Sequence, residues 1–247
     1  MARPRLPRGF AMRIDALLTR LGIGSRSEVQ KLIRRGAVSV NGMTVRTPGE
    51  SVHPGTALTV NGQPVDARTE RTVMLYKPVG VLTAARDPKA PTVMDLLPVV
   101  YRSLGCMPVG RLDKDTTGLL LLTTDGELAH RLISPRRDIE KTYLATVDTP
   151  LRPEDITAFA AGLDLGDFTA KAAVLEIADA HTARITVTEG KYHQVRRMLA
   201  ACGHETLTLH RERVGPLTLD PALQPGEMRE LADEELTALK TAVEILA

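Results

Sequence analysis

An Arg-x-Asp pair directly before an apolar run is the feature of this sequence best suited to chemistry. Residues 110–126 read GRLDKDTTGLLLLTTDG, with Arg111 and Asp113 at the start. Four leucines that end at an Asp-Gly turn are typical of a strand buried on both faces. Such a strand fixes the residue leading into it, so Asp113 is expected at the rim of a core, which is where a fold places a reactive group. The alternative is a turn aspartate that caps its own backbone.

The same stretch, residues 110–126, resembles the signature of the pseudouridine synthases of the Rsu type, which modify ribosomal RNA. Lys77-Pro78-Val79-Gly80 is similar to the K-P-x-G turn of that family, and Lys141-Thr142-Tyr143 to its K-T-Y motif. The resemblance implies that Asp113 is the catalytic aspartate. Turning uridine into pseudouridine breaks a C–N bond and makes a C–C bond without adding a group, so the reaction requires no cofactor and no metal.

The resemblance also implies a cationic partner for Asp113. A nearby guanidinium favours the ionised carboxylate and orients it. Arg196, in the motif QVRRM, is implied to be this partner, with Arg111 as support. Arg197 stands about a hundred degrees further around the same helix and is predicted to face RNA or solvent. The sequence leaves open which of Arg196 and Arg197 pairs with Asp113.

The K-T-Y match assigns roles to Tyr143 and Lys141. Tyr143 is expected to stack on the flipped uracil, against the alternative of an ordinary aromatic at a sheet edge, and Lys141 to contact a phosphate. Two mechanisms fit these residues: Asp113 attacks C1′ of the ribose, or it adds to C6 of the base. A glycosidase is disfavoured, because hydrolysis uses two carboxylates and only Asp115 is close in sequence.

The composition is that of an ordinary globular protein. The chain has 247 residues, 43% of them hydrophobic and 25% charged. No apolar run approaches the roughly 20 residues that cross a membrane, and the N-terminus lacks the features of a signal peptide, so we expect a cytoplasmic protein without a membrane partner. Cys202 and the nearby histidines match no zinc-binding spacing, so no metal is predicted.

Positive charge is concentrated near the N-terminus. Residues 1–47 hold ten Lys and Arg against two acidic residues, a net charge of +8, whereas the whole chain carries only +2. The remainder is therefore acidic, at −6. A basic module on an acidic body indicates a part that binds a polyanion, although a solvated helix face would also fit the charge count.

This basic region predicts two helices followed by a hairpin. Ser25 and Glu28 form a capping-box pattern before the second helix, and Asn41-Gly42 marks a hairpin turn. The stretch 25–42, SRSEVQKLIRRGAVSVNG, resembles an S4-type RNA-binding domain, with a generic αα-β packing unit as the alternative. The resemblance implies that the cations of the second helix contact RNA, namely Arg26, Lys31, Arg34 and Arg35.

The sequence predicts an α+β protein of two domains. We expect a disordered basic arm at residues 1–11, an S4-type domain at 12–62, a linker at 63–71 and the catalytic domain at 72–247. Strands outnumber helices in the larger domain and do not alternate strictly with them. This pattern favours a mixed, mainly antiparallel sheet flanked by helices.

The choice of RNA rests on resemblance to a subgroup. Residues 192–195 (YHQV), 209–215 (LHRERVG) and 226–236 resemble the members that act on 16S rRNA, whereas members acting on 23S rRNA carry Asn-Arg in place of Tyr192-His193. The resemblance implies uridine 516 of 16S rRNA, within a partly assembled small-subunit particle. The alternatives are an enzyme for 23S rRNA, and a non-enzymatic RNA-binding factor of ribosome assembly on the same fold.

Overall fold

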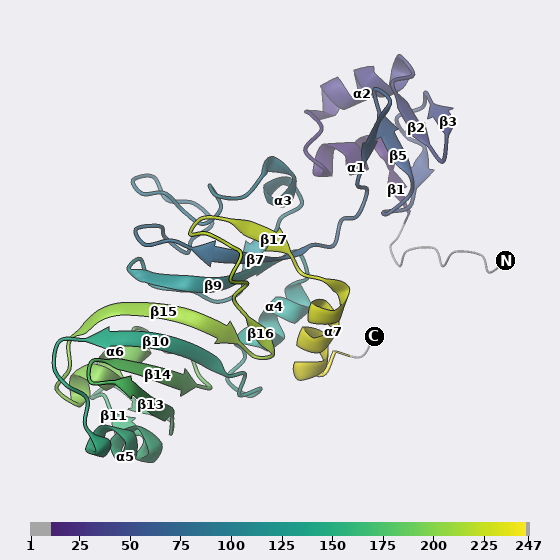
Figure 1. Cartoon of the computed structure of the whole chain (residues 1–247). Helices are drawn as coiled ribbons and strands as arrows, with labels where there is room; N and C mark the ends of the chain where they lie inside the picture. The colour runs from purple at the N-terminus through teal and green to yellow at the C-terminus, as the bar shows by residue number, and fades with distance from the viewer. Residues whose placement is uncertain (1–10, 246–247) are drawn as a thin grey trace. The chain divides into compact units, whose positions relative to one another are not determined.

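The computed structural model describes residues 11–245 and divides the chain into two compact units (Figure 1). Unit 1 reaches Arg71 and includes the later segment Leu97–Cys106, and unit 2 consists of Thr72–Leu96 and the chain from Met107 onward. The predicted basic arm lies, except for residue 11, outside the described residues.

Unit 1 packs helices against a four-stranded sheet of order β3-β2-β5-β6. The second helix begins at the predicted capping box: the Ser25 hydroxyl accepts from the Glu28 amide, and the Glu28 carboxylate accepts from the Ser25 amide at 2.8 Å. The elements are β1 (Met12–Arg13), α1 (Ile14–Arg20), α2 (Arg26–Arg34), β2 (Val38–Val40), β3 (Met43–Val45), β4 (Ser51–Val52), β5 (Leu58–Val60), β6 (Gln63–Val65) and α3 (Val99–Ser103).

Two features of unit 1 differ from the expected domain boundaries. The expected linker at residues 63–71 begins with β6, which pairs with β5 and completes the sheet. The segment Leu97–Cys106, expected in the catalytic domain, contributes Leu104 to the hydrophobic core of unit 1, with Val100 packed beside it. Burial of these apolar side chains explains why the segment groups with unit 1.

Asp15 is an ionised group inside unit 1. Its side chain is 1% exposed and accepts from Arg13 Nε at 3.0 Å, Arg13 Nη2 at 2.9 Å and Gln30 Nε2 at 3.1 Å. The hydrogen bonds from Arg13 lower the pKa of Asp15 to about 2. A carboxyl with a lowered folded-state pKa stabilises the fold above its unfolded pKa, and that contribution is lost as the pH falls through its folded pKa.

Asp15→Asn is therefore expected to lower the free energy of unfolding at α1 by about 2 kcal/mol at neutral pH, because each unit of pKa shift corresponds to about 1.4 kcal/mol. The difference from the wild type should shrink as the pH falls from about 4 to about 2. Hydrogen exchange of the α1 amides at several pH values measures it. A difference that stays constant over this range would contradict the role of the Asp15 charge.

Unit 2 is built on a sheet of order β13-β14-β10-β15-β9-β7-β17, with β8 and β16 at its margins. Only β9 and β15 pair in parallel among the described strands of this sheet, which confirms the mixed, mainly antiparallel prediction. Its strands are β7 (Thr72–Lys77), β8 (Met107–Pro108), β9 (Thr116–Thr123), β10 (Lys141–Val147), β13 (Val174–Asp179), β14 (Thr182–Val187), β15 (Thr206–Val214), β16 (Leu217–Thr218) and β17 (Met228–Glu230).

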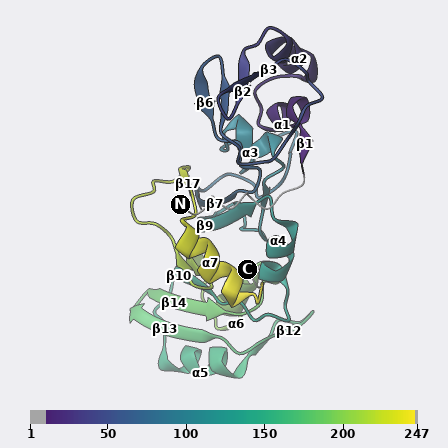
Figure 2. The ribbon, with the colours of Figure 1, turned by 90° about the vertical axis from the view of Figure 1, so that its right-hand side faces the viewer.

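Helices and a small hairpin complete unit 2. They are α4 (Gly126–Ile133), α5 (Pro153–Ala161), the hairpin of β11 (Leu163–Asp164) and β12 (Thr169–Ala170), α6 (Gln194–Ala201) and α7 (Asp233–Ala242). The predicted leucine strand is β9, and its four leucines are at most 1% exposed. Leu119 and Leu121 pack in one cluster with residues of α4 and α7, two helices that lie side by side in Figures 1 and 2. The burial of β9 gives the preceding loop a rigid base.

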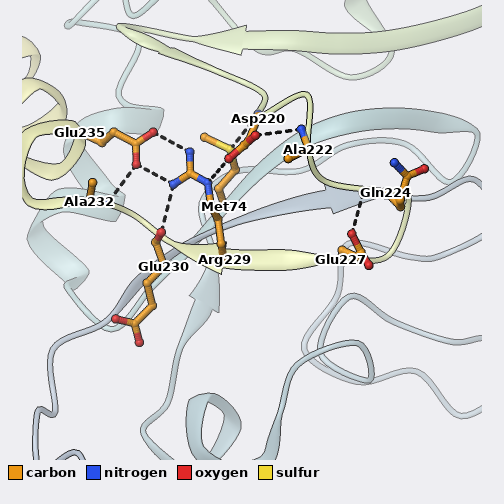
Figure 3. A network of polar contacts seen from close by, with 9 residues as sticks. All are labelled: Met74, Asp220, Ala222, Gln224, Glu227, Arg229, Glu230, Ala232 and Glu235. Carbon is orange, nitrogen blue, oxygen red and sulfur yellow. Dashed lines mark hydrogen bonds and ion pairs between the residues drawn. The ribbon is translucent and has the colours of Figure 1, made fainter.

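The edge strand β17 is tied to α7 by Arg229. The Arg229 guanidinium forms ion pairs with Asp220 and with Glu235 in the first turn of α7, and it donates to the Glu230 carbonyl (Figure 3). The Asp220 amide also contacts the Met74 sulfur of the neighbouring β7. This network fixes the C-terminal segment on the edge of the sheet that bears Lys77.

Candidate active site

The loop that carries Asp113 is braced by Lys77 at the end of β7. Lys77 is fully buried, and its Nζ donates to the carbonyls of Pro78 at 3.0 Å, Lys114 at 3.2 Å and Thr116 at 2.9 Å. Two of these carbonyls follow closely after Asp113 in sequence. Three carbonyl acceptors match the three N–H donors of an ammonium group. The protonated form of Lys77 therefore holds the loop in place.

Burial lowers the pKa of Lys77 to about 8, against the opposing effect of the negative charges of Asp113 and Asp115. The ammonium form therefore still predominates at neutral pH. A second brace is Thr83, whose hydroxyl donates to the Leu112 carbonyl at 2.8 Å and lies 3.2 Å from the Leu112 amide. Both sides of Asp113 are thus held by buried hydrogen bonds.

The Asp113 side chain lines a hollow between this loop and the start of α6. This side chain is 32% exposed, and His193 Nε2 lies 3.5 Å from its Oδ1. Tyr143 and Thr116 also line the hollow. The Thr116 hydroxyl is buried without a hydrogen-bond partner in the described structure. A buried hydroxyl of this kind offers a hydrogen bond to a bound molecule, because leaving it unpaired costs free energy.

His193 is the neighbour of Asp113 that the sequence analysis did not assign. It stands at the N-cap of α6 with φ of 50°, a backbone conformation that is uncommon for residues other than glycine. The Tyr192 ring stacks on its imidazole with centroids 3.9 Å apart, and Tyr192 is 76% exposed. The Tyr-His pair in the subgroup motif was the available signal. In the structure His193 lines the Asp113 hollow, and Tyr192 stacks on it.

The expected pairing of Arg196 with Asp113 is not present, so this interpretation is corrected. Arg196 Nη1 donates to the Thr206 carbonyl at 3.1 Å, and Arg196 lines a separate shallow hollow with Asp148 and His204. Arg197 does not pair with Asp113 either, because its guanidinium pairs with Asp167 and donates to the Leu165 carbonyl. The physical reason is that the left-handed N-cap brings His193 to the carboxylate, whereas Arg196 and Arg197, in the first turn of α6, point to the carbonyls of Thr206 and Leu165.

Arg111 and Tyr143 lie at the junction of two hollows. Both residues line the Asp113 hollow and a second one that contains Lys141. Among the described residues, no carboxylate lies within the 4 Å of an ion pair with Arg111, so the expected support of Asp113 by Arg111 is not seen as a direct contact. Tyr143, expected to stack on the flipped uracil, is 9% exposed and lines both hollows.

The predicted RNA-binding cations of unit 1 are on the surface of α2 and its C-terminus. Arg26 has a side chain 71% exposed, with Nε 3.8 Å from Asp15. Lys31, Arg34 and Arg35 are also exposed, and Arg35 donates to the Asn61 side chain at 3.2 Å. These cations thus remain available to a polyanion.

The described residues contain neither a membrane-spanning helix nor a metal-binding cluster. Between residues 11 and 245, no helix combines the length and the apolar character that a membrane span needs. The same part of the chain holds no cluster of three or more His, Cys, Asp or Glu side chains placed to bind a metal ion.

Comparison with known proteins relates the chain to enzymes that act on RNA. Residues 71–201 match the family RNA pseudouridylate synthase, and residues 12–58 match the S4 domain. An uncharacterized RNA pseudouridine synthase of Bacillus subtilis is 44% identical over 92% of this chain and 98% of that protein. The ribosomal small subunit pseudouridine synthase A of Escherichia coli K12 is 41% identical over 92% of this chain and 100% of that protein. The crystal structure of a pseudouridylate synthase, 35% identical, matches with a TM-score of 0.65 over 92% of this chain and 99% of that one.

Proposed function

Because this chain belongs to the RNA pseudouridylate synthase family, we propose that it converts uridine 516 of 16S ribosomal RNA to pseudouridine in a small-subunit assembly particle, with Asp113 as the nucleophile. The observation that carries the proposal is the braced carboxylate of Asp113, which opens into a hollow walled by an aromatic ring. An enzyme that isomerises a base within RNA needs both a reactive group of fixed position and a surface for the flipped base.

The roles of the residues follow from their places in the hollow. The Asp113 carboxylate attacks either C1′ or C6, and both routes need it within contact distance of one nucleoside. Tyr143 stacks on the flipped uracil, and the unpaired Thr116 hydroxyl offers a hydrogen bond to it. His193, 3.5 Å from Asp113, orients the carboxylate in the place expected for Arg196.

The choice of 16S rRNA is supported by two observations. The Escherichia coli relative whose name specifies the small subunit aligns with this chain over its whole length. The exposed Tyr192-His193 pair, which carries the subgroup resemblance, lies beside Asp113. Bases stack on exposed aromatic rings, so this pair is suited to contact a nucleotide next to the target. The S4 unit supplies phosphate contacts that position the protein on RNA, and such an enzyme works in the cytoplasm.

Pseudouridine mapping of total rRNA from cells with and without the gene tests the proposed function. The position 516 signal of 16S rRNA should disappear with the gene and return with the wild-type chain. Loss of a signal in 23S rRNA instead would refute the 16S target. An unchanged map, together with RNA binding by the purified chain, would favour a non-enzymatic assembly factor.

Tyr143 offers a separate test of base stacking. Tyr143→Ala should weaken binding of the target RNA by about 1–3 kcal/mol, the usual value of one base–aromatic stack, whereas Tyr143→Phe keeps the ring and should retain most of the affinity. Binding to one RNA fragment and single-turnover pseudouridine formation should be measured for both variants. If Tyr143→Ala matched the wild type in both measurements, the platform for the base would lie elsewhere.

A further inference from the structure

The second hollow of unit 2 adjoins the Asp113 hollow and is rich in unpaired cations. Arg111, Tyr143 and Gly190 line both hollows, and Lys141 and Arg211 line only the second. The hollow is open to solvent. Three cations, Arg111, Lys141 and Arg211, thus line one hollow whose wall contains no acidic residue, so their positive charge calls for an anionic ligand.

Arg211 is the most deeply buried of these cations, at 4% exposed. Its Nε donates to the Leu119 carbonyl at 2.8 Å, and its guanidinium carbon lies 6.0 Å from the centre of the Tyr143 ring. In the described structure its two terminal nitrogens have no hydrogen-bond acceptor, and no carboxylate lies within ion-pair distance. Burying a charge without a partner is costly, so these nitrogens are suited to receive an anion.

The backbone holds Arg211 firmly in this position. It pairs with Gly118 across the parallel strands β9 and β15, where φ of Gly118 is +106° and a Cβ atom would lie 2.3 Å from the Arg211 carbonyl oxygen. Only glycine allows this close approach. The guanidinium is therefore presented by two rigid strands, as a preorganised binding site requires.

Lys141 adds a second positive charge to the same hollow. Its Nζ donates to the Ile139 carbonyl at 2.8 Å and has no carboxylate within ion-pair distance among the described residues. Burial, followed by the positive charge of Arg211, lowers the pKa of Lys141 to about 8. The carboxylates of Asp138 and Glu189 act in the opposite direction. A bound anion would relieve the repulsion between the two cations.

We propose that the hollow of Lys141 and Arg211 binds a phosphate of the substrate RNA, at the phosphodiester next to the uridine presented to Asp113. This inference rests on the proposed function and adds a binding site to it. Arginine and lysine together are suited to phosphate, because the guanidinium donates two parallel hydrogen bonds and the ammonium adds a compact charge. Since Tyr143 borders both hollows, a phosphate held in one sets the position of the base in the other.

The salt dependence of RNA binding tests the inference. Arg211→Gln and Lys141→Met should each weaken binding of a 16S rRNA fragment about tenfold and reduce the slope of log K against log [salt] by about 1, as expected for one lost phosphate contact. Arg213→Gln is the matched control, because Arg213 lies two residues along β15, is exposed and pairs with Glu140. All variants carry Asp113→Asn so that bound RNA is not converted.

Each result decides the inference. An unchanged slope in both Arg211→Gln and Lys141→Met would overturn it, and so would an equal loss in Arg213→Gln, which would indicate only general surface charge. If Arg211→Gln does not fold, Lys141→Met decides alone. If inorganic phosphate raises the melting temperature of the wild type but not of Lys141→Met, while the RNA slope is unchanged, the site serves the free ion and the RNA inference is wrong. A wild type that makes no pseudouridine would refute the proposed function and leave the slope comparison valid.

Discussion

Asp113→Asn is expected to abolish pseudouridine formation while the protein stays folded and binds RNA. The Asp113 side chain is about one-third exposed, and His193 Nε2 lies 3.5 Å from it, so an amide of the same shape should fit without rearrangement. Loss of a nucleophile reduces turnover by about 10⁴-fold or more. Single-turnover assays on an rRNA fragment measure the loss, and thermal unfolding checks the fold.

Asp115→Asn is the matched control for this experiment. Asp115 lies in the same turn, is exposed, and like Asp113 acts on Lys77 through its negative charge. Its substitution should leave turnover close to that of the wild type. Equal losses in the two variants would indicate that negative charge near Lys77 matters rather than a reacting carboxylate, and activity of Asp113→Asn near the wild-type level would refute the assignment.

The parts of the fold that the sequence predicted are those with local signals. The capping box of Ser25 and Glu28 starts α2, and the leucine run forms β9, because each depends on residues close in sequence. The likeness to the S4 domain and to the pseudouridine synthases is confirmed by the matching families. The grouping of Leu97–Cys106 with unit 1 was missed, because it depends on contacts with residues more than seventy positions earlier, such as that between Val99 and Gly22.

In the candidate site too, the features with a sequence motif were predicted and those set by backbone conformation or distant contacts were not. Motif resemblance placed Asp113 and Tyr143, which the structure brings to one hollow. It did not predict that His193 rather than Arg196 faces Asp113, because this depends on the left-handed backbone of His193, for which the sequence carries no local rule. It also did not assign Arg211, since burial of an unpaired arginine is decided by the pairing of β9 with β15, strands that are distant in sequence.

Lys77→Met is expected to reduce turnover at least a hundredfold with little change in RNA affinity. The side chain of Lys77 is buried, and methionine of similar length can fill its space without donating to the carbonyls of Pro78, Lys114 and Thr116. Buried carbonyls that lose their donors cost about 1–3 kcal/mol each in stability, although the Gly80 amide still serves the Lys114 carbonyl. Displacement of a catalytic group by about 1 Å costs about a hundredfold in rate, so the loop that carries Asp113 need move only slightly.

Lys114→Met separates this brace from a general loss of positive charge. The Lys114 side chain is exposed, and only its backbone carbonyl takes part in the brace, so this variant removes one charge beside Asp113 and keeps every hydrogen bond of Lys77. Both variants should be compared in single-turnover assays at saturating RNA, where differences in affinity no longer contribute. Because Lys77 lies outside both hollows, retained RNA binding with lost turnover would identify it as a residue that positions Asp113. Turnover by Lys77→Met equal to that of Lys114→Met would show that the carbonyl brace is dispensable.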